Sequence, residues 1–185
     1  MSTSVTDTAE KQSSQEVRFI GFLKGLAERE DRGALAKLRR GLGKVKPTSE
    51  AWPLLIPRVE GVPERQRDCY FLVAALFALY HDAPGQCGNM GETFKAVGDH
   101  ESAQKRFVAM LDSDVQDLPH RLRQAISIAK SKGAPVNWLQ LLKDIIHWES
   151  DNLYVQYKWA GSYWKAPAPE SDTKTTTPTN EKEGE

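Results

Sequence analysis

The chain has 185 residues, a formal net charge of zero at pH 7 and two cysteines. Its length suits one hydrophobic core of ordinary size rather than two domains. Cys69 and Cys87 match no metal-ligand spacing and the N-terminus has no signal-peptide pattern, so we expect a protein of the reducing cytoplasm. The longest apolar run, Cys69–Tyr80, is shorter than the roughly 20 residues of a membrane span, so we expect no membrane contact.

Charge is distributed unevenly along this neutral chain. Residues 1–16 hold one lysine and three acidic residues, a net charge of −2, and residues 166–185 hold two lysines and five acidic residues, a net charge of −3. Residues 17–165 therefore carry +5. Both ends lack the large apolar side chains that would offset the entropy of ordering them. We expect a disordered polar tail at 1–13, a folded domain at 14–165 and a disordered acidic tail at 166–185.

The first two predicted helices each have one apolar face. They begin at the cap Ser14 and at about Gly33. The residues expected to face inward are Val17, Ile20, Phe22, Leu23 and Leu26 in the first helix, and Leu35, Leu38, Leu42 and Val45 in the second. From Arg32 to Lys46 there are six basic residues and no acidic one. The outward residues of the second helix are Lys37, Arg40 and Lys44, with Arg39 at its flank.

Helical spacing continues through the middle of the chain. A short helix carries Trp52 to Ile56, and a long buried helix begins at Pro63-Glu64, with Arg67 near its start. After an irregular loop at 82–92, we expect a short helix at 94–97 and another over 99–111. No strand alternation is convincing. The prediction is an all-α fold of eight or nine helices, arranged as two small packed bundles.

The segment 117–165 separates core from surface most clearly. Its first helix has an apolar stripe of Leu118, Leu122, Ala125 and Ala129, opposite His120, Arg123, Ser127 and Lys130. The next helix begins at the N-cap Asn137, with Trp138, Leu141, Leu142 and Ile145 inside and Lys143 outside. No acidic residue occurs from Leu118 to Lys143, whereas five basic residues do. This run of one sign of charge points to a polyanionic ligand.

The final predicted helix, from about Asn152, is apolar on two faces. One side carries Leu153, Tyr157, Ala160 and Trp164. The other side carries Val155, Trp159 and Ser162. Such a helix is either wedged between neighbours or held against another chain. We expect Trp159 to lie on the exposed side and, with Val155, to form a subunit interface.

No motif for catalysis, a metal or a cofactor is present. The four histidines, at 81, 100, 120 and 147, are scattered. The dipeptide His81-Asp82 is similar to the centre of all-α phosphohydrolases, but no further metal ligands can be assigned. Gly41-Leu42-Gly43-Lys44 has the wrong spacing for a phosphate-binding loop. We therefore expect no metal site and no enzymatic activity.

Three segments carry a resemblance to a known family. They are ALAKLRRGLG at 34–43, SAQKRFVAML at 102–111 and, above all, LPHRLRQAISIAKSKGAPVNWLQLLKDIIHWESDNLYVQYKWAGSYW at 118–164. In the order of these pieces the chain resembles the CasB family, the small subunit of the type I-E CRISPR interference complex, Cascade. The likeness implies a non-catalytic, ribonucleoprotein-bound protein of antiviral defence. Its implied partners are guide RNA, target DNA, the other Cascade subunits and a second copy of itself.

The resemblance also implies nucleic-acid-binding residues. Basic positions of the family fall on Arg39, Arg40, Arg67, Lys105, Arg106, Arg121, Arg123 and Lys143. Together with the basic helix faces, the predicted set is Lys37, Arg39, Arg40, Lys44, Arg67, Lys105, Arg106, Arg121, Arg123, Lys130 and Lys143. Family members with further arginines after the 99–111 helix differ from this chain, which has Asp112, Ser113 and Asp114 there.

Three functions are compatible with these patterns. The first is stabilisation of the R-loop by basic contacts to the target and displaced DNA strands. The second is a helical scaffold or adaptor whose basic faces are merely solvated. The third, an all-α phosphohydrolase, would require bound metal. The first requires that basic side chains from separate helices, such as Arg40, Arg123 and Lys143, converge in space.

Overall fold

The computed structural model describes residues 3–44, 46–84, 87–98 and 100–165, and of residues 3–14 the backbone only. These residues form nine α-helices, one 3-10 helix and no strand, which confirms the predicted all-α fold. The elements are α1 (Thr3–Glu28), α2 (Arg32–Arg39), α3 (Trp52–Leu55), η1 (Ile56–Arg58), α4 (Glu64–Leu79), α5 (Met90–Val97), α6 (Glu101–Leu111), α7 (Leu118–Lys132), α8 (Trp138–Ile146) and α9 (Tyr154–Trp164).

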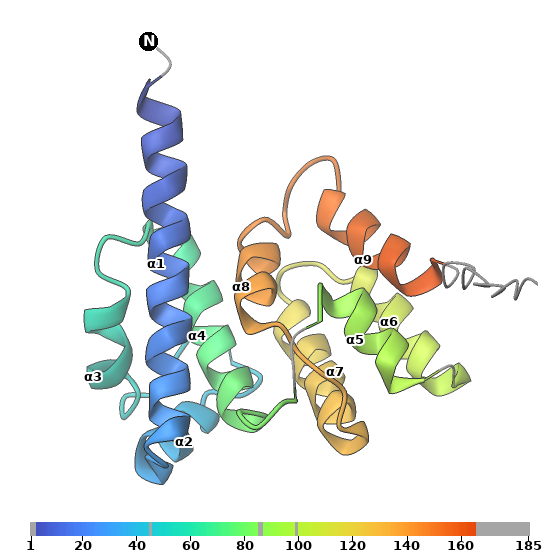
Figure 1. Ribbon diagram of the computed structural model, residues 1–185, viewed down its shortest axis with the longest axis horizontal. Helices are drawn as coiled ribbons and strands as arrows, with labels where there is room; N and C mark the ends of the chain where they lie inside the picture. Colours follow the sequence, from blue (N-terminus) through green and yellow to red (C-terminus); the bar gives the residue numbers. More distant parts are fainter. Residues whose placement is uncertain (1–2, 45, 85–86, 99, 166–185) are drawn as a thin grey trace, which may run out of the picture.

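The helices form two groups that lie side by side (Figure 1). The first contains α1 to α4 together with α8, which packs against α1 and α4 although it follows α7 in the chain. The second contains α5, α6, α7 and α9. Contact between α4 and α7 joins the groups. The predicted pair of small bundles is therefore present, with α8 crossing from one to the other.

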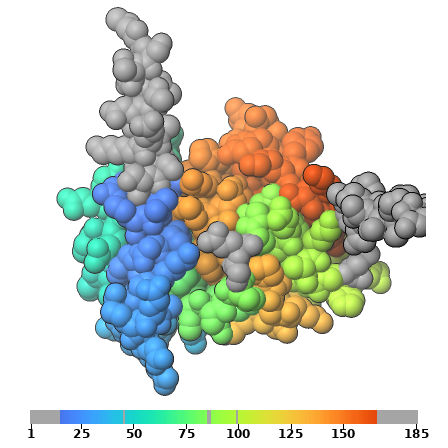
Figure 2. Space-filling view, viewed as in Figure 1, coloured from blue at the N-terminus to red at the C-terminus, as the bar shows by residue number. Residues whose placement is uncertain are grey.

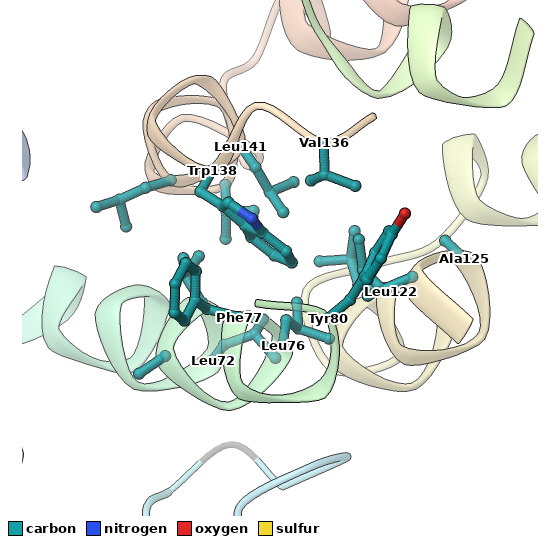
Figure 3. Packing of buried hydrophobic residues seen from close by; sticks show 14 of the residues in the cluster. Leu72, Leu76, Phe77, Tyr80, Leu122, Ala125, Val136, Trp138 and Leu141 are labelled. Atoms are coloured by element: carbon teal, nitrogen blue, oxygen red, sulfur yellow. The ribbon is translucent and has the colours of Figure 1, made fainter. Parts of the chain in front are cut away.

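A continuous apolar core joins the two groups (Figure 3). Phe77 of α4 meets Trp138 of α8 edge to face, with ring centroids 5.5 Å apart. Tyr80, at the end of α4, lies beside Leu122 of α7 (Figure 3). Because both groups share buried side chains, α4 holds α7 in a fixed position relative to α2.

Polar side chains fix the beginnings of two of these helices. Asn137 accepts a hydrogen bond from the backbone N–H of Gln140 at 3.0 Å, which confirms its predicted capping role. Its amide also donates to the carbonyl of Cys87 at 2.9 Å, so α8 is tied to the chain before α5. Asp31 caps α2 by accepting from Ala34 N–H at 2.9 Å. Each cap is typically worth about 1 kcal/mol.

Helix α1 differs from its prediction at both its start and its inner face. It begins at Thr3 rather than Ser14, since no Gly or Pro interrupts residues 3–14. The disorder expected for residues 1–13 stays a prediction. Val17 is 51% exposed, and Phe19 takes an inward position instead. The acidic tail expected at 166–185 lies outside the described residues, and the domain boundaries stay predictions.

Helix α2 ends at Arg39, earlier than predicted. Gly43 has a φ of 74°, a conformation that glycine adopts without strain, and a turn replaces the expected last helical turn. Leu42 is only half-buried. Val45, predicted to be buried, lies outside the described residues.

The predicted orientation of α9 is wrong. Val155 and Trp159, expected at a subunit interface, are both 0% exposed in the chain's own core, whereas Leu153, Tyr157 and Trp164 are 49%, 71% and 51% exposed. The indole N–H of Trp159 donates to the buried Asp144 carboxylate at 2.6 Å. The apolar residues lie on both sides of α9, so their spacing could not show which side faces inward.

A close helix contact leads to a first testable prediction. A Cβ on Gly91 of α5 would lie 2.9 Å from the carbonyl carbon of Trp159, inside normal contact distance. We expect Gly91→Ala to lower the free energy of unfolding by about 1–3 kcal/mol, because the backbones of α5 and α9 must separate. The control is Gly161→Ala in α9, where a Cβ meets nothing within 4 Å and should be neutral or stabilising. Equal melting temperatures for both variants would contradict this prediction.

Candidate nucleic-acid interface

Two basic side chains from different helices meet at the C-terminal end of α4. Arg39 of α2 donates from Nε to the carbonyl of Ala78 at 3.0 Å. Lys130 of α7 donates from Nζ to the carbonyl of Leu79 at 2.8 Å. The last turn of α4 has no basic residue of its own. The two cations therefore complement the negative end of the helix dipole and lie on neighbouring carbonyls.

Arg123 extends this cluster along α7. It lies two helical turns before Lys130, on the same side of the helix. Its guanidinium lies 3.7 Å from the place that a Cβ on Gly43 would occupy. The turn after α2 therefore lies directly beside Arg123, and this turn continues into the exposed Lys44.

A groove between α6 and α7 continues the same surface. It encloses about 450 Å³. Its lining residues are Arg106, His120, Arg123, Gln124, Ser127 and Ile128. The two helices lie next to each other on the surface seen in Figure 2. We call this the α6–α7 groove, and we call Arg39, Lys44, Arg106, Arg123 and Lys130 together the basic face.

The cations of the basic face retain unused hydrogen-bond donors. Among the described residues, none of the five forms an ion pair with a carboxylate. Arg39 uses its Nε–H to donate to the carbonyl of Ala78. A guanidinium has five N–H donors and an ammonium has three, so further donors remain on each side chain. The basic face can therefore still bind an anion, and phosphate oxygens suit the fork geometry of arginine.

Four other predicted residues lie away from the basic face or are paired with carboxylates. Arg40 pairs with Glu50, and Lys105 pairs with Glu101 at 2.7 Å on the exposed side of α6. Lys143 lies 3.9 Å from Glu16 of α1. Arg67 donates to the carbonyl of Val62 at the start of α4, roughly 18 Å along that helix from Leu79. Arg40 and Lys143 are therefore each next to a carboxylate, and their convergence with Arg123 stays a prediction.

The remaining two predicted residues take intermediate positions. Lys37 is exposed on α2, and Arg121 is half-buried on α7. Because residues two positions apart on a helix point in different directions, Arg121 does not share the side of Arg123. Among the described residues, neither Lys37 nor Arg121 has a contact that places it on the basic face.

The predicted set omitted His120, Gln124 and Ser127 of the α6–α7 groove. Gln124 and His120 are hydrogen-bonded through Nε2 atoms 2.9 Å apart. Their positions, with Arg123, follow helical spacing on one face of α7, so the outward stripe itself was a usable signal. Charge was not a usable signal, because only His120 among these three residues can be charged.

The Glu16–Lys143 pair gives a second testable prediction. Glu16 is 3% exposed, and its burial raises its pKa above 4.5 despite the opposing charges of Lys143 and His147. A raised pKa means that the folded chain binds this proton more tightly than the unfolded chain does. Stability is therefore expected to fall as pH rises from about 4.5 through the folded pKa. Burial also raises the pKa of Asp144, with the same sign.

Glu16→Gln should remove one source of this slope. We expect the variant to gain stability relative to the parent at pH 7 more than at pH 4.5, measured by urea unfolding. Glu28→Gln, an exposed change on the same helix, is the control. An unchanged difference between parent and Glu16→Gln at the two pH values would refute the assignment.

Other chemistry finds no support among the described residues. They contain no group of three or more His, Cys, Asp or Glu side chains placed to hold a metal ion. His81 and Asp82 are both exposed after the end of α4. In the described part of the chain, no helix has the length and apolar character needed to cross a membrane.

Comparison with known proteins gives consistent matches. The sequence profile of the family described as CRISPR-associated protein Cse2 matches residues 34–164. A protein of that name from Thermus thermophilus is 31% identical over 166 residues, which cover 85% of this chain and 94% of the relative. The crystal structure of CasB from Thermus thermophilus matches with a TM-score of 0.69 at 30% identity, covering 82% of this chain and 98% of that one.

One further match extends the comparison of folds. A chain in a structure described as a CRISPR RNA-guided surveillance complex matches with a TM-score of 0.68. Its identity is 20%, and the match covers 82% of this chain and 92% of that chain. At this identity the likeness concerns the fold alone.

Fold and surface together define an all-α protein with two packed helical bundles and a basic face assembled from separate helices. The chain belongs to the Cse2 family of CRISPR-associated proteins. The resemblance to CasB drawn from the sequence is thereby confirmed.

Proposed function

We propose that this chain is a non-catalytic small subunit of a type I-E Cascade complex and stabilises the R-loop by binding phosphates of the target and displaced DNA strands. The observation that carries the proposal is the basic face. Two of its cations, Arg39 of α2 and Lys130 of α7, meet at the end of α4 although they are distant in sequence, and Arg123 of α7 lies beside the turn that follows α2. Arg106 extends the surface across the α6–α7 groove.

The mechanism is electrostatic. Arginine and lysine displace condensed counterions from phosphates, which gives affinity that is independent of sequence and decreases with added salt. Sequence choice is left to base pairing between guide and target. R-loop formation is nearly balanced in free energy, and 1.4 kcal/mol is a factor of ten, so two or three phosphate contacts have a large effect on its lifetime.

The proposed partners are guide RNA, target DNA, the other Cascade subunits and a second copy of this chain, in the cytoplasm. Family membership supports the assembly. The fold shared with a chain of a CRISPR RNA-guided surveillance complex agrees with it. Among the described residues, no Phe, Tyr or Trp side chain lines the α6–α7 groove, which suits contacts to phosphates.

The test is co-purification with guide RNA and the other subunits, followed by strand-resolved crosslinking to target DNA. We expect crosslinks from α7 and α6 peptides to the displaced or target strand. Crosslinks confined to protein neighbours would reject the DNA-binding role while leaving membership of the complex intact.

A structural scaffold is the second candidate, because Arg39 and Lys130 also stabilise the end of α4. This alternative assigns those two side chains to folding alone. It predicts that Arg106 and Arg123, which make no such contact with α4, can be replaced without any effect on target engagement. The two candidates are therefore separated by variants of the α6–α7 groove.

A further inference from the structure

The described chain ends beside α6, the helix that supplies Arg106 to the α6–α7 groove. The rings of Trp164 and Phe107 have centroids 5.7 Å apart, and Phe107 directly follows Arg106 in α6. Lys95 of α5 donates to the carbonyl of Lys165 at 2.7 Å, which fixes the exit of the chain at this place. The described chain therefore ends at Lys165, close to one of the two helices that form the groove.

The charges of the two partners are complementary. Residues 166–185 contain five acidic residues and two lysines, a net charge of −3. The basic face has five cations with no ion pair among the described residues. The surface that suits phosphates thus also suits a run of carboxylates.

Length permits the contact within one chain. A segment as long as 166–185 reaches at most roughly 65 Å, whereas α7 is about 22 Å long. A tethered segment also competes at an effective concentration on the order of millimolar, which makes a weak electrostatic contact significant.

We propose that the acidic segment 166–185 binds the α6–α7 groove of its own chain and competes there with nucleic acid. Its carboxylates occupy the positions of phosphates on Arg106, Arg123 and Lys130. The consequence for nucleic-acid binding rests on the proposed function, whereas the contact itself does not. The competition restricts the basic face to polyanions dense enough in charge to displace the tail, such as the strands of an R-loop.

The test uses the full chain with its five tail carboxylates neutralised: Glu170→Gln, Asp172→Asn, Glu181→Gln, Glu183→Gln and Glu185→Gln. We expect this variant to bind a fluorescent oligothymidylate about fivefold more tightly than the parent at 50 mM salt, with the difference vanishing at high salt. A control neutralises five exposed carboxylates elsewhere: Glu28→Gln, Glu60→Gln, Asp68→Asn, Glu149→Gln and Asp151→Asn. The control should change affinity less than twofold.

Carbodiimide crosslinking tests the contact without nucleic acid. We expect monomeric parent to give tail-to-Lys130 links well above tail-to-Lys24 links, and Arg123→Glu to lose that preference. Equal linking to both lysines, or an equal gain in affinity for the tail and control variants, would overturn the proposal. If no variant binds oligonucleotide, the proposed function fails and the crosslinks alone decide on the tail contact.

Discussion

Replacing Trp159 by alanine is expected to lower the free energy of unfolding by about 3–5 kcal/mol. Trp159 is 0% exposed and lies 5.1 Å from Trp148, measured between ring centroids. The change also removes the indole donor from Asp144, a carboxylate that is 3% exposed. A buried acceptor left without its donor adds to the cost of the cavity. The measurement is urea unfolding of the isolated protein, with circular dichroism as the signal that monitors unfolding.

Tyr157→Ala is the matched control for this experiment. Tyr157 lies on the same helix but is 71% exposed, so its replacement should change the unfolding free energy by less than about 0.5 kcal/mol. Trp159→Phe, which keeps a ring but no donor, should fall between the two. Normal unfolding of Trp159→Ala combined with lost assembly would instead support the original assignment of Trp159 to a subunit interface.

Reversing the charges of Arg106 and Arg123 should shorten the lifetime of the R-loop by roughly tenfold or more. Each lost charge-assisted contact is worth on the order of 1 kcal/mol or more, and every 1.4 kcal/mol is a factor of ten. Both side chains line the α6–α7 groove, whereas the hydrogen bonds found on the end of α4 in the described part of the chain come from Arg39 and Lys130. The melting temperature of the isolated subunit should therefore stay close to that of the parent. The lifetime is measured on assembled complexes by dissociation of labelled target DNA.

The control reverses Arg18 and Lys24, exposed residues of α1 that make the same change in net charge. Their reversal should leave the R-loop lifetime within twofold. Arg40 is unsuitable for either variant, since Arg40→Glu would face Glu50. Equal lifetimes for the Arg106/Arg123 variant and the control pair would favour the scaffold.

Helix existence and the inner faces of α7 and α8 could be predicted because each has one apolar stripe and a clear boundary. Asn137 caps α8 as expected, and Leu122 and Leu142 are fully buried. Helix α9 has apolar residues on both sides, so its spacing could not show that Trp159 is buried. The hydrogen-bond partner of Trp159, Asp144 of α8, is brought next to it only by the fold. Spacing within a helix gives a face but not the neighbour that covers it.

The basic face could be predicted only in part. Helical spacing placed Arg123 and Lys130 on the surface of α7, but not beside Gly43 or on the end of α4. An uncompensated basic run in sequence also does not exclude pairing in space, as the distant Glu16 beside Lys143 shows. Carboxylates brought close by folding decide which cations remain available.

The central claim is that Arg106 and Arg123 on the basic face neutralise phosphates, and the salt dependence of single-stranded DNA binding tests it most directly. The slope of log K against log salt concentration is about −0.7 per neutralised phosphate. Replacing Arg106 and Arg123 by alanine should make the slope less steep by roughly 1.4, whereas Arg18→Ala with Lys24→Ala should leave it unchanged. An identical slope for parent and the Arg106/Arg123 variant would contradict the account.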